Sequence, residues 1–141
     1  MYGIDKTPFG YHVTIEGSLS DSETAQLKQE VAGRLSDQTA AFSVIVDLRK
    51  LIPPHRDGLK ILRDCAEFAL RAGMIRIAII YTSPVVREQI KQTAFMSGRN
   101  PVGRYIDATG TEDPERVARD YVESGIEPPP MSRKPHKALA R

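Results

Sequence analysis

Segments with the pattern of strands alternate with segments with the pattern of helices along most of this 141-residue chain. Two apolar runs rich in β-branched residues, 42–48 and 75–80, are typical of strands that are buried on both faces of a sheet. A segment with apolar residues at helical spacing follows each run. Because helices between successive strands act as right-handed crossovers, the sheet should be mostly parallel. The pattern predicts an α/β fold with a mostly parallel sheet of about five strands and four helices.

The N-terminal strands should form an antiparallel edge of this sheet. Residues 11–15 alternate between apolar and polar side chains, as in a strand with one buried face. Residues 2–4 are predicted to pair with that strand as a hairpin that turns at 6–10. The expected sheet is therefore parallel except at its first strand.

Local signals predict where the first two helices lie. Ser20 and Glu23 have the spacing of a capping box, which predicts a helix over 21–35. The second helix should begin near Gly58, where a stripe of apolar residues at helical spacing starts. It should end at Gly73, because glycine suits a left-handed C-cap.

Hydroxyl and proline residues mark the last two helices. Ser83 is followed by a proline at the first helical position, which predicts a helix that closes at Gly98. A short strand should follow over 105–107. Thr111 or Asp113 then caps a final helix, which has a proline in its first turn.

Composition is that of one ordinary globular domain, with 27% charged and 40% hydrophobic residues. The net charge of +2 is too small to indicate nucleic-acid binding. We expect residues 1–125 to form the domain. Residues 126–141 begin with a run of three prolines and continue as a basic segment without periodicity, so this tail is expected to be disordered.

The residues that usually carry chemistry are scattered. The single cysteine, Cys65, excludes an internal disulfide and a cysteine-based metal site, and it should pack as a small hydrophobic residue. The three histidines (His12, His55 and His136) fall on a strand, a loop and the tail, without the spacing of metal ligands. No catalytic residues, metal site or cofactor are expected, and the chain is not expected to be an enzyme.

Targeting signals are also missing from the sequence. The N-terminus has no basic segment followed by an apolar one, so no signal peptide is expected. The longest apolar run is far shorter than the ~20 residues that a membrane-spanning helix needs. One unpaired thiol is compatible with a reducing compartment. The predicted location is the cytoplasm.

The corner between the strand ending at Leu48 and the second helix carries the strongest functional signal. Two prolines stiffen its approach, and His55 and Arg56 should be exposed there. Asp57 places a carboxylate at the positive end of the helix dipole. Aspartate is also a preferred N-cap, so Asp57 is expected to cap the helix whether or not it has a signalling role.

Three segments of the chain resemble a known family. The run Val44-Ile45-Val46-Asp47-Leu48, the pair Gly58-Leu59, and 77–87 with its Ser-Pro-Val-Val-Arg ending match the STAS domain in order and spacing. STAS is the fold of bacterial anti-sigma-factor antagonists and of the cytoplasmic domains of sulfate transporters. The match spans about 11–122. It implies a bacterial, non-enzymatic regulatory domain whose partner is an anti-sigma factor, a kinase or another STAS protein.

One departure from the family matters for regulation. The family signature before Gly-Leu is Asp-Ser-Ser or Asp-Ser-Thr, and a partner kinase phosphorylates its second hydroxyl residue. Here the three positions are His55, Arg56 and Asp57, so an aspartate stands at the equivalent of the phosphorylation site. Aspartate carries a smaller charge than phosphoserine and has fewer acceptor oxygens. The resemblance therefore implies a domain that cannot be switched at this position.

Two functional hypotheses follow, and oligomeric state, including a homodimer, is left open. In the leading hypothesis the domain binds a regulatory protein through the loop and the exposed face of the next helix: Pro54, His55, Arg56, Asp57, Lys60, Arg63 and Asp64. In the alternative, a pocket between sheet and helices holds a lipid or another apolar molecule. STAS-like folds are shared with lipid-carrier domains, and a large apolar cavity would support that alternative.

Overall fold

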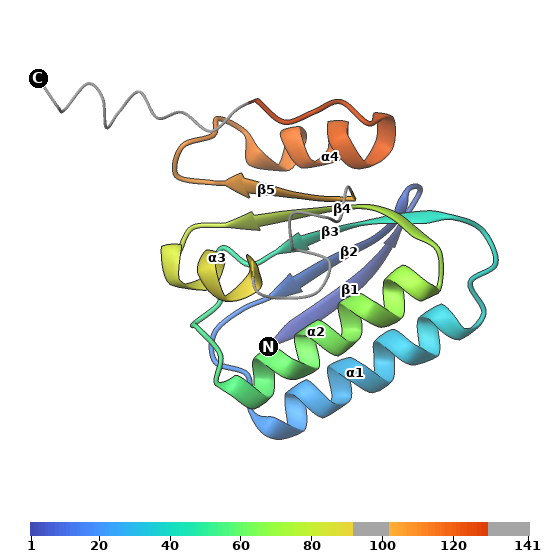
Figure 1. The fold of residues 1–141 in the computed structure, drawn as a ribbon, viewed down its shortest axis with the longest axis vertical. Coiled ribbons are helices and arrows are strands. Elements are labelled where there is room, and N and C mark those ends of the chain that lie inside the picture. Colours follow the sequence, from blue (N-terminus) through green and yellow to red (C-terminus); the bar gives the residue numbers. More distant parts are fainter. Residues whose placement is uncertain (92–101, 130–141) are drawn as a thin grey trace, which may run out of the picture.

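The computed structural model describes residues 1–91 and 102–129 as one α/β domain, in which helices cover both faces of a central sheet (Figure 1). Strand order in the sheet follows the chain, with β1 antiparallel to β2 and the remaining pairs parallel. The predicted five strands, four helices and antiparallel edge are confirmed. The elements are β1 (Tyr2–Thr7), β2 (Gly10–Ile15), α1 (Asp21–Ser36), β3 (Phe42–Asp47), α2 (Arg56–Arg71), β4 (Met74–Tyr81), α3 (Pro84–Lys91), β5 (Gly103–Asp107) and α4 (Pro114–Ser124).

The helices form unequal layers on the sheet. Helices α1 and α2 lie side by side on one face, while α4 packs on the other face over β3, β4 and β5 (Figure 1). The two apolar cores between these layers explain why β4 is a continuous apolar run. Ile77 and Ile79 point into the core below α1 and α2, whereas Ala78 and Ile80 point into the core below α4.

Helix starts follow the predicted capping signals at three of the four helices. The backbone N–H of Glu23 donates to Ser20 Oγ at 3.1 Å, and that of Ser20 donates to Glu23 Oε1 at 3.1 Å, so the capping box is confirmed. Ser83 Oγ accepts from the N–H of Val86 at 3.3 Å, which confirms the start of α3. Asp113, one of the two predicted caps, is the N-cap of α4. The predicted end at Gly98 lies outside the described residues.

The start of α2 differs from the prediction. The helix begins at Arg56, two residues before Gly58, and its N-cap is His55, whose side chain makes no capping hydrogen bond. The first backbone bond of the helix runs from Leu59 N–H to the carbonyl of His55 at 2.9 Å. Asp57 therefore lies inside the first turn, so the prediction that it caps the helix is wrong. A carboxylate inside the first turn still interacts favourably with the helix dipole.

None of the helices in 1–91 and 102–129 is both long enough and apolar enough to cross a membrane. Helix α4 ends at Gly125, which has a φ of +73° and so takes the left-handed conformation that favours glycine. Beyond it, Glu127 forms a bidentate ion pair with Arg104 of β5, at 2.7 and 2.9 Å. Residues 130–141, most of the tail that we predicted to be disordered, lie outside the described residues.

Candidate functional site

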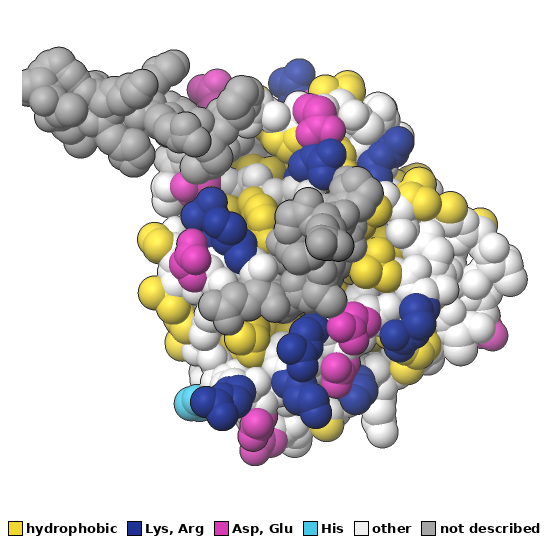
Figure 2. Space-filling model, in the orientation of Figure 1, with side chains coloured by type: hydrophobic (Ala, Val, Ile, Leu, Met, Phe, Trp, Pro, Cys, Tyr) yellow, Lys and Arg dark blue, Asp and Glu magenta, His cyan; other side chains and the backbone are white. Residues whose placement is uncertain are grey.

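The predicted site residues gather at the N-terminal tip of α2, at the end of the sheet where β3 stops (Figure 1). His55, Arg56, Asp57 and Lys60 are all exposed. Asp57 is thus accessible at the helix tip, where the resemblance places the phosphate-accepting position. In the space-filling view of Figure 2, Lys and Arg side chains are interspersed with Asp and Glu side chains over the surface formed by α1 and α2.

The loop leading into α2 is held by α3. Gln89 Nε2 donates to the backbone carbonyl of Pro54 at 3.1 Å. Pro54 is half-buried, and its Cβ lies only 3.4 Å from the place where a Cβ on Gly58 would stand. The exposed residues at the tip therefore stand on a fixed support, which lowers the conformational entropy lost when a partner binds. Sequence reasoning missed Gln89, because nothing local links residue 89 to residue 54.

Charges on α2 separate into two stripes. Arg56, Lys60 and Arg63 follow one another at four- and three-residue spacing and so share one side of the helix. Asp64 Oδ2 is instead 3.4 Å from Lys28 Nζ on α1, which commits that carboxylate to the neighbouring helix. The structure therefore places Asp64 at the edge of the predicted surface, and in the basic stripe Arg56 and Lys60 are exposed while Arg63 is half-buried.

An exposed apolar pair accompanies the charged tip. Ile52 is 54% exposed and Val85, in the first turn of α3, is 56% exposed. Val85 lies one helical turn before Gln89 and therefore shares its side of α3. Because Gln89 contacts Pro54, that side of α3 faces the loop. These two side chains add apolar area next to the loop, and the sequence did not identify them.

A polar cluster fixes the segment between β3 and the loop. Arg49 donates to both oxygens of Asp47, at 3.0 and 2.7 Å, and to Glu115 Oε2 at 2.9 Å. Glu115 Oε1 is also 3.2 Å from His12 Nε2, so the cluster joins β2, β3 and α4. Burial alone would raise the pKa of Asp47, but the hydrogen bonds and positive charge of Arg49 outweigh it and lower that pKa. Arg49 bridges the two carboxylates, so the cluster ties the end of β3 to α4.

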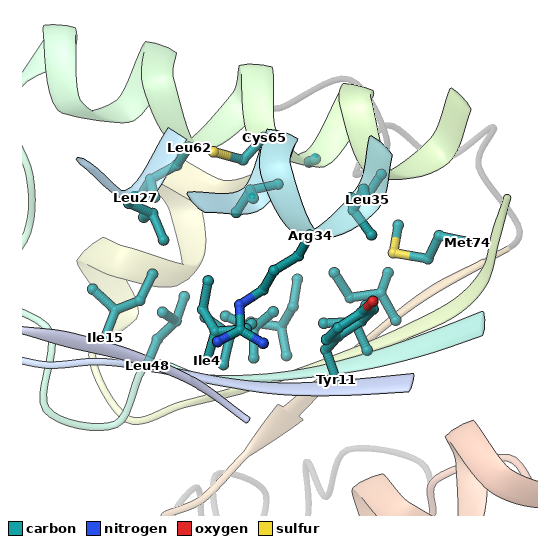
Figure 3. Close-up of a pocket in the computed structure, with 18 of the residues that line it drawn as sticks. Ile4, Tyr11, Ile15, Leu27, Arg34, Leu35, Leu48, Leu62, Cys65 and Met74 are labelled. Atoms are coloured by element: carbon teal, nitrogen blue, oxygen red, sulfur yellow. The ribbon is translucent and has the colours of Figure 1, made fainter. Parts of the chain in front are cut away.

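A cavity of about 130 Å³ lies between the sheet and helices α1 and α2 (Figure 3). Its lining is apolar apart from Arg34, and it includes Cys65. Burial raises the pKa of the Cys65 thiol to about 11, so the thiol stays protonated and unreactive at neutral pH. Drug-sized ligands usually occupy pockets of roughly 300–1,000 Å³. The cavity is thus too small to favour the lipid-carrier alternative.

No group of three or more His, Cys, Asp or Glu side chains in the described parts of the chain is placed to hold a metal ion.

Comparisons with known proteins identify the fold. No family model matches the sequence, and no curated protein matches it. Solved structures do match. An anti-sigma factor antagonist from Mycobacterium paratuberculosis has a TM-score of 0.55 at 17% identity, over 85% of this chain and 94% of that chain. The phosphorylated form of the Bacillus cell fate determinant SpoIIAA has a TM-score of 0.58 at 15% identity, over 84% and 98%.

A third structure gives the same result. An uncharacterized protein of the DUF3478 family from Shewanella loihica PV-4, described as having a SpoIIAA-like fold, has a TM-score of 0.57 at 17% identity, over 86% of this chain and 92% of its own. All three matches cover nearly the full length of the other chain. This chain therefore has the SpoIIAA-like fold of STAS domains and anti-sigma-factor antagonists.

Proposed function

We propose that this chain is a non-enzymatic regulatory domain of the bacterial cytoplasm that binds a protein partner through the tip of α2. The observation that carries the proposal is the fold shared with two antagonist structures, SpoIIAA among them, over more than four fifths of this chain. The proposed surface, called the α2 tip below, consists of Pro54, His55, Arg56, Asp57, Lys60 and Arg63, with Asp64 at its edge.

The physical properties of the α2 tip suit protein recognition. Its loop is held by the hydrogen bond from Gln89, so little conformational entropy is lost when a partner binds. Arginine, here the exposed Arg56, is enriched at the hot spots of interfaces. The stripe of Arg56, Lys60 and Arg63 favours a partner that presents carboxylates opposite it. An anti-sigma factor, a kinase or another STAS protein, including a second copy of this chain, is the class of partner we propose.

Asp57 fixes the charge state of this surface in our proposal. The stretch from Leu48 to Lys60 contains no serine, threonine or tyrosine. A phosphoserine carries about −1.5 to −2 charges, whereas aspartate carries a single negative charge that no phosphatase removes. The domain would therefore be held in one permanent state, intermediate in charge between a free hydroxyl and a phosphate.

Charge reversal at the α2 tip tests the proposed surface. We expect Arg56→Glu and Asp57→Lys each to abolish capture of the partner by the tagged full-length chain. Each variant reverses a charge at the centre of the α2 tip and so removes its charge complementarity with the partner. Both side chains are exposed, so the thermal midpoint should barely change. Arg71→Glu is the matched control, since Arg71 is exposed at the far end of the same helix.

Binding that survives both reversals would place the partner surface elsewhere. Equal loss in Arg71→Glu would show instead a response to overall charge and not to the α2 tip.

Phosphorylation tests the role of Asp57. Incubation with a serine kinase of the anti-sigma type and ATP should leave the wild-type chain unmodified, as measured by intact mass. Asp57→Ser restores a hydroxyl at the helix tip and should become a substrate. Phosphate on any residue of the wild-type chain after this incubation would contradict a permanently fixed switch.

A further inference from the structure

We propose that the cavity beneath α1 and α2 is a binding site for a small monocarboxylate with an apolar body of about six carbons, whose carboxylate is held by Arg34. This site is separate from the α2 tip and does not depend on the proposed function. Three observations support it: the apolar lining, the volume and the charges at the rim.

The lining comes from both layers of the fold. Strands β2, β3 and β4 contribute one wall, with buried side chains such as Val44, Ile77 and Ile79, and helices α1 and α2 contribute the other with Leu27 and Ala66. No polar group of this inner lining offers hydrogen bonds to several water molecules at once. A cavity of this kind stays dry or takes an apolar guest, because water needs about 2–4 polar partners to remain.

Volume sets the size of the guest. An engineered apolar cavity of roughly 150 Å³ binds benzene, which has six carbons. The cavity here, at about 130 Å³, is close to that size. It can hold a phenyl ring or a short aliphatic chain, whereas a long-chain lipid would not fit.

Arg34 supplies the polar end of the site. In Figure 3 its side chain extends from α1 towards Ile4 on β1, across the space between the helix and the sheet. The side chain is 38% exposed, so the guanidinium stands where the cavity lining reaches solvent. Its Nε donates to Glu30 Oε2 at 3.0 Å, and the other Glu30 oxygen accepts from the Tyr2 hydroxyl at 3.0 Å. In the described part of the chain, its two terminal nitrogens have no hydrogen-bond acceptor.

A second cation stands on the same side of the sheet. Lys6 Nζ lies 4.7 Å from the ring centroid of Tyr11, another lining residue. Lys6 and Tyr11 are paired across β1 and β2, two positions along from the pair formed by Ile4 and Val13 and so on the same face of the sheet. Arg34 lines the cavity, and Lys6 lies over the ring of a lining residue. These two cations favour an anionic head group, and a carboxylate matches the two free terminal nitrogens of a guanidinium.

Three straight-chain ligands of six carbons each, which differ in their head groups, test the site. We expect hexanoate to bind the full-length chain saturably in calorimetric titration, 1-hexanol to bind more weakly and hexylamine to bind weakest. Arg34→Gln should weaken hexanoate binding about tenfold, by removing a charge-assisted pair, and leave 1-hexanol binding unchanged. Arg71→Gln removes an exposed arginine that does not line the cavity and should change the binding of neither ligand.

Filling the cavity tests the location. Ala66→Leu adds three carbons to the lining and should abolish the binding of both hexanoate and 1-hexanol. If this variant fails to fold, nuclear Overhauser effects between hexanoate and the Ile77 and Ile79 methyl groups of the wild-type chain locate the ligand. No saturable binding of hexanoate, equal affinity for hexylamine, or hexanoate contacts confined to surface residues would each overturn the proposal.

Discussion

At the scale of single residues, Gly10 leaves least room for a side chain among the glycines compared in the described part of the chain. Its φ is +147°, and a Cβ built there would lie 2.1 Å from the backbone oxygen of Ser43. We expect Gly10→Ala to lower the free energy of unfolding by about 2–4 kcal/mol, because both backbone strain and a clash with β3 result. Gly3→Ala is the control, because a Cβ built at Gly3 has no atom within 4 Å. This variant should change the free energy of unfolding by less than about 0.5 kcal/mol. Urea denaturation of both variants measures the difference, and equal stability would contradict this account of the hairpin.

Asp47 should make stability depend on pH. Its pKa is lowered in the folded state, so folding favours the ionised carboxylate. The stabilisation is present above the ordinary aspartate pKa, near pH 4, and is lost as pH falls through the lowered folded value. Asp47→Asn should therefore cost about 1–3 kcal/mol at pH 7, and this cost should begin to fall as pH drops below about 4. Denaturation of both proteins between pH 7 and pH 3 measures the effect, and parallel curves would exclude it.

Residue-scale predictions from the sequence succeed where the partners are close along the chain. The capping box joins Ser20 to Glu23, only three positions away, and both hydrogen bonds are present. The His12–Glu115 contact joins residues 103 positions apart, so no local pattern indicates it. The cavity rim at Arg34 was missed for the same reason: its position depends on how α1 lies over β1.

At the scale of elements, α2 begins without a side-chain cap. His55 has the extended backbone of an N-cap, but its ring accepts no bond from the first turn. We expect His55→Asp to raise the free energy of unfolding by about 1 kcal/mol, because a carboxylate accepts such a bond and faces the positive end of the dipole.

Ser20→Ala is the matched control for this prediction, with the opposite expected effect on stability. It removes the existing capping box of α1 and should lower stability by about 1 kcal/mol. Thermal melts of both variants give the two signs. A His55→Asp protein no more stable than wild type would show that the free N–H groups of α2 are already satisfied.

The misplaced start of α2 has a physical reason. Sequence reasoning took Asp57 as the cap because aspartate is a strong capping residue and Gly58 precedes the apolar stripe. In the structure the two prolines and the contact between Gln89 and Pro54 set the chain direction, and the helix begins at the first residue after His55. Tertiary contact thus overrides the local capping preference.

At the scale of the whole molecule, all buried apolar residues of the described chain precede Glu123. A chain that ends at Pro129 should therefore keep the thermal midpoint of the full chain. Residues 130–141 hold four cations and no acidic residue, so their removal changes the net charge from +2 to −2. Thermal melts of the two chains at moderate salt compare them, and a clear fall in the midpoint would show that the tail contributes to the fold.

The overall architecture was the most predictable feature. Buried runs such as 42–48 and 75–80 indicate central strands whatever their neighbours, and the helices between them impose a parallel sheet. The exposure and the ion pairs of surface residues were less predictable, because they depend on which side of each helix packs against its neighbours. The pairing of Asp64 with Lys28 and the exposure of Val85 are both results of packing between elements.

Every strand lies beside the one that precedes it along the chain, so none has to insert between strands that are already paired. A nascent polypeptide leaving the ribosome can add each new strand to a free edge as it emerges. We expect the sheet to assemble in one direction, from the N-terminal hairpin outwards. Each new strand then closes only a short loop, and no strand has to move when synthesis ends.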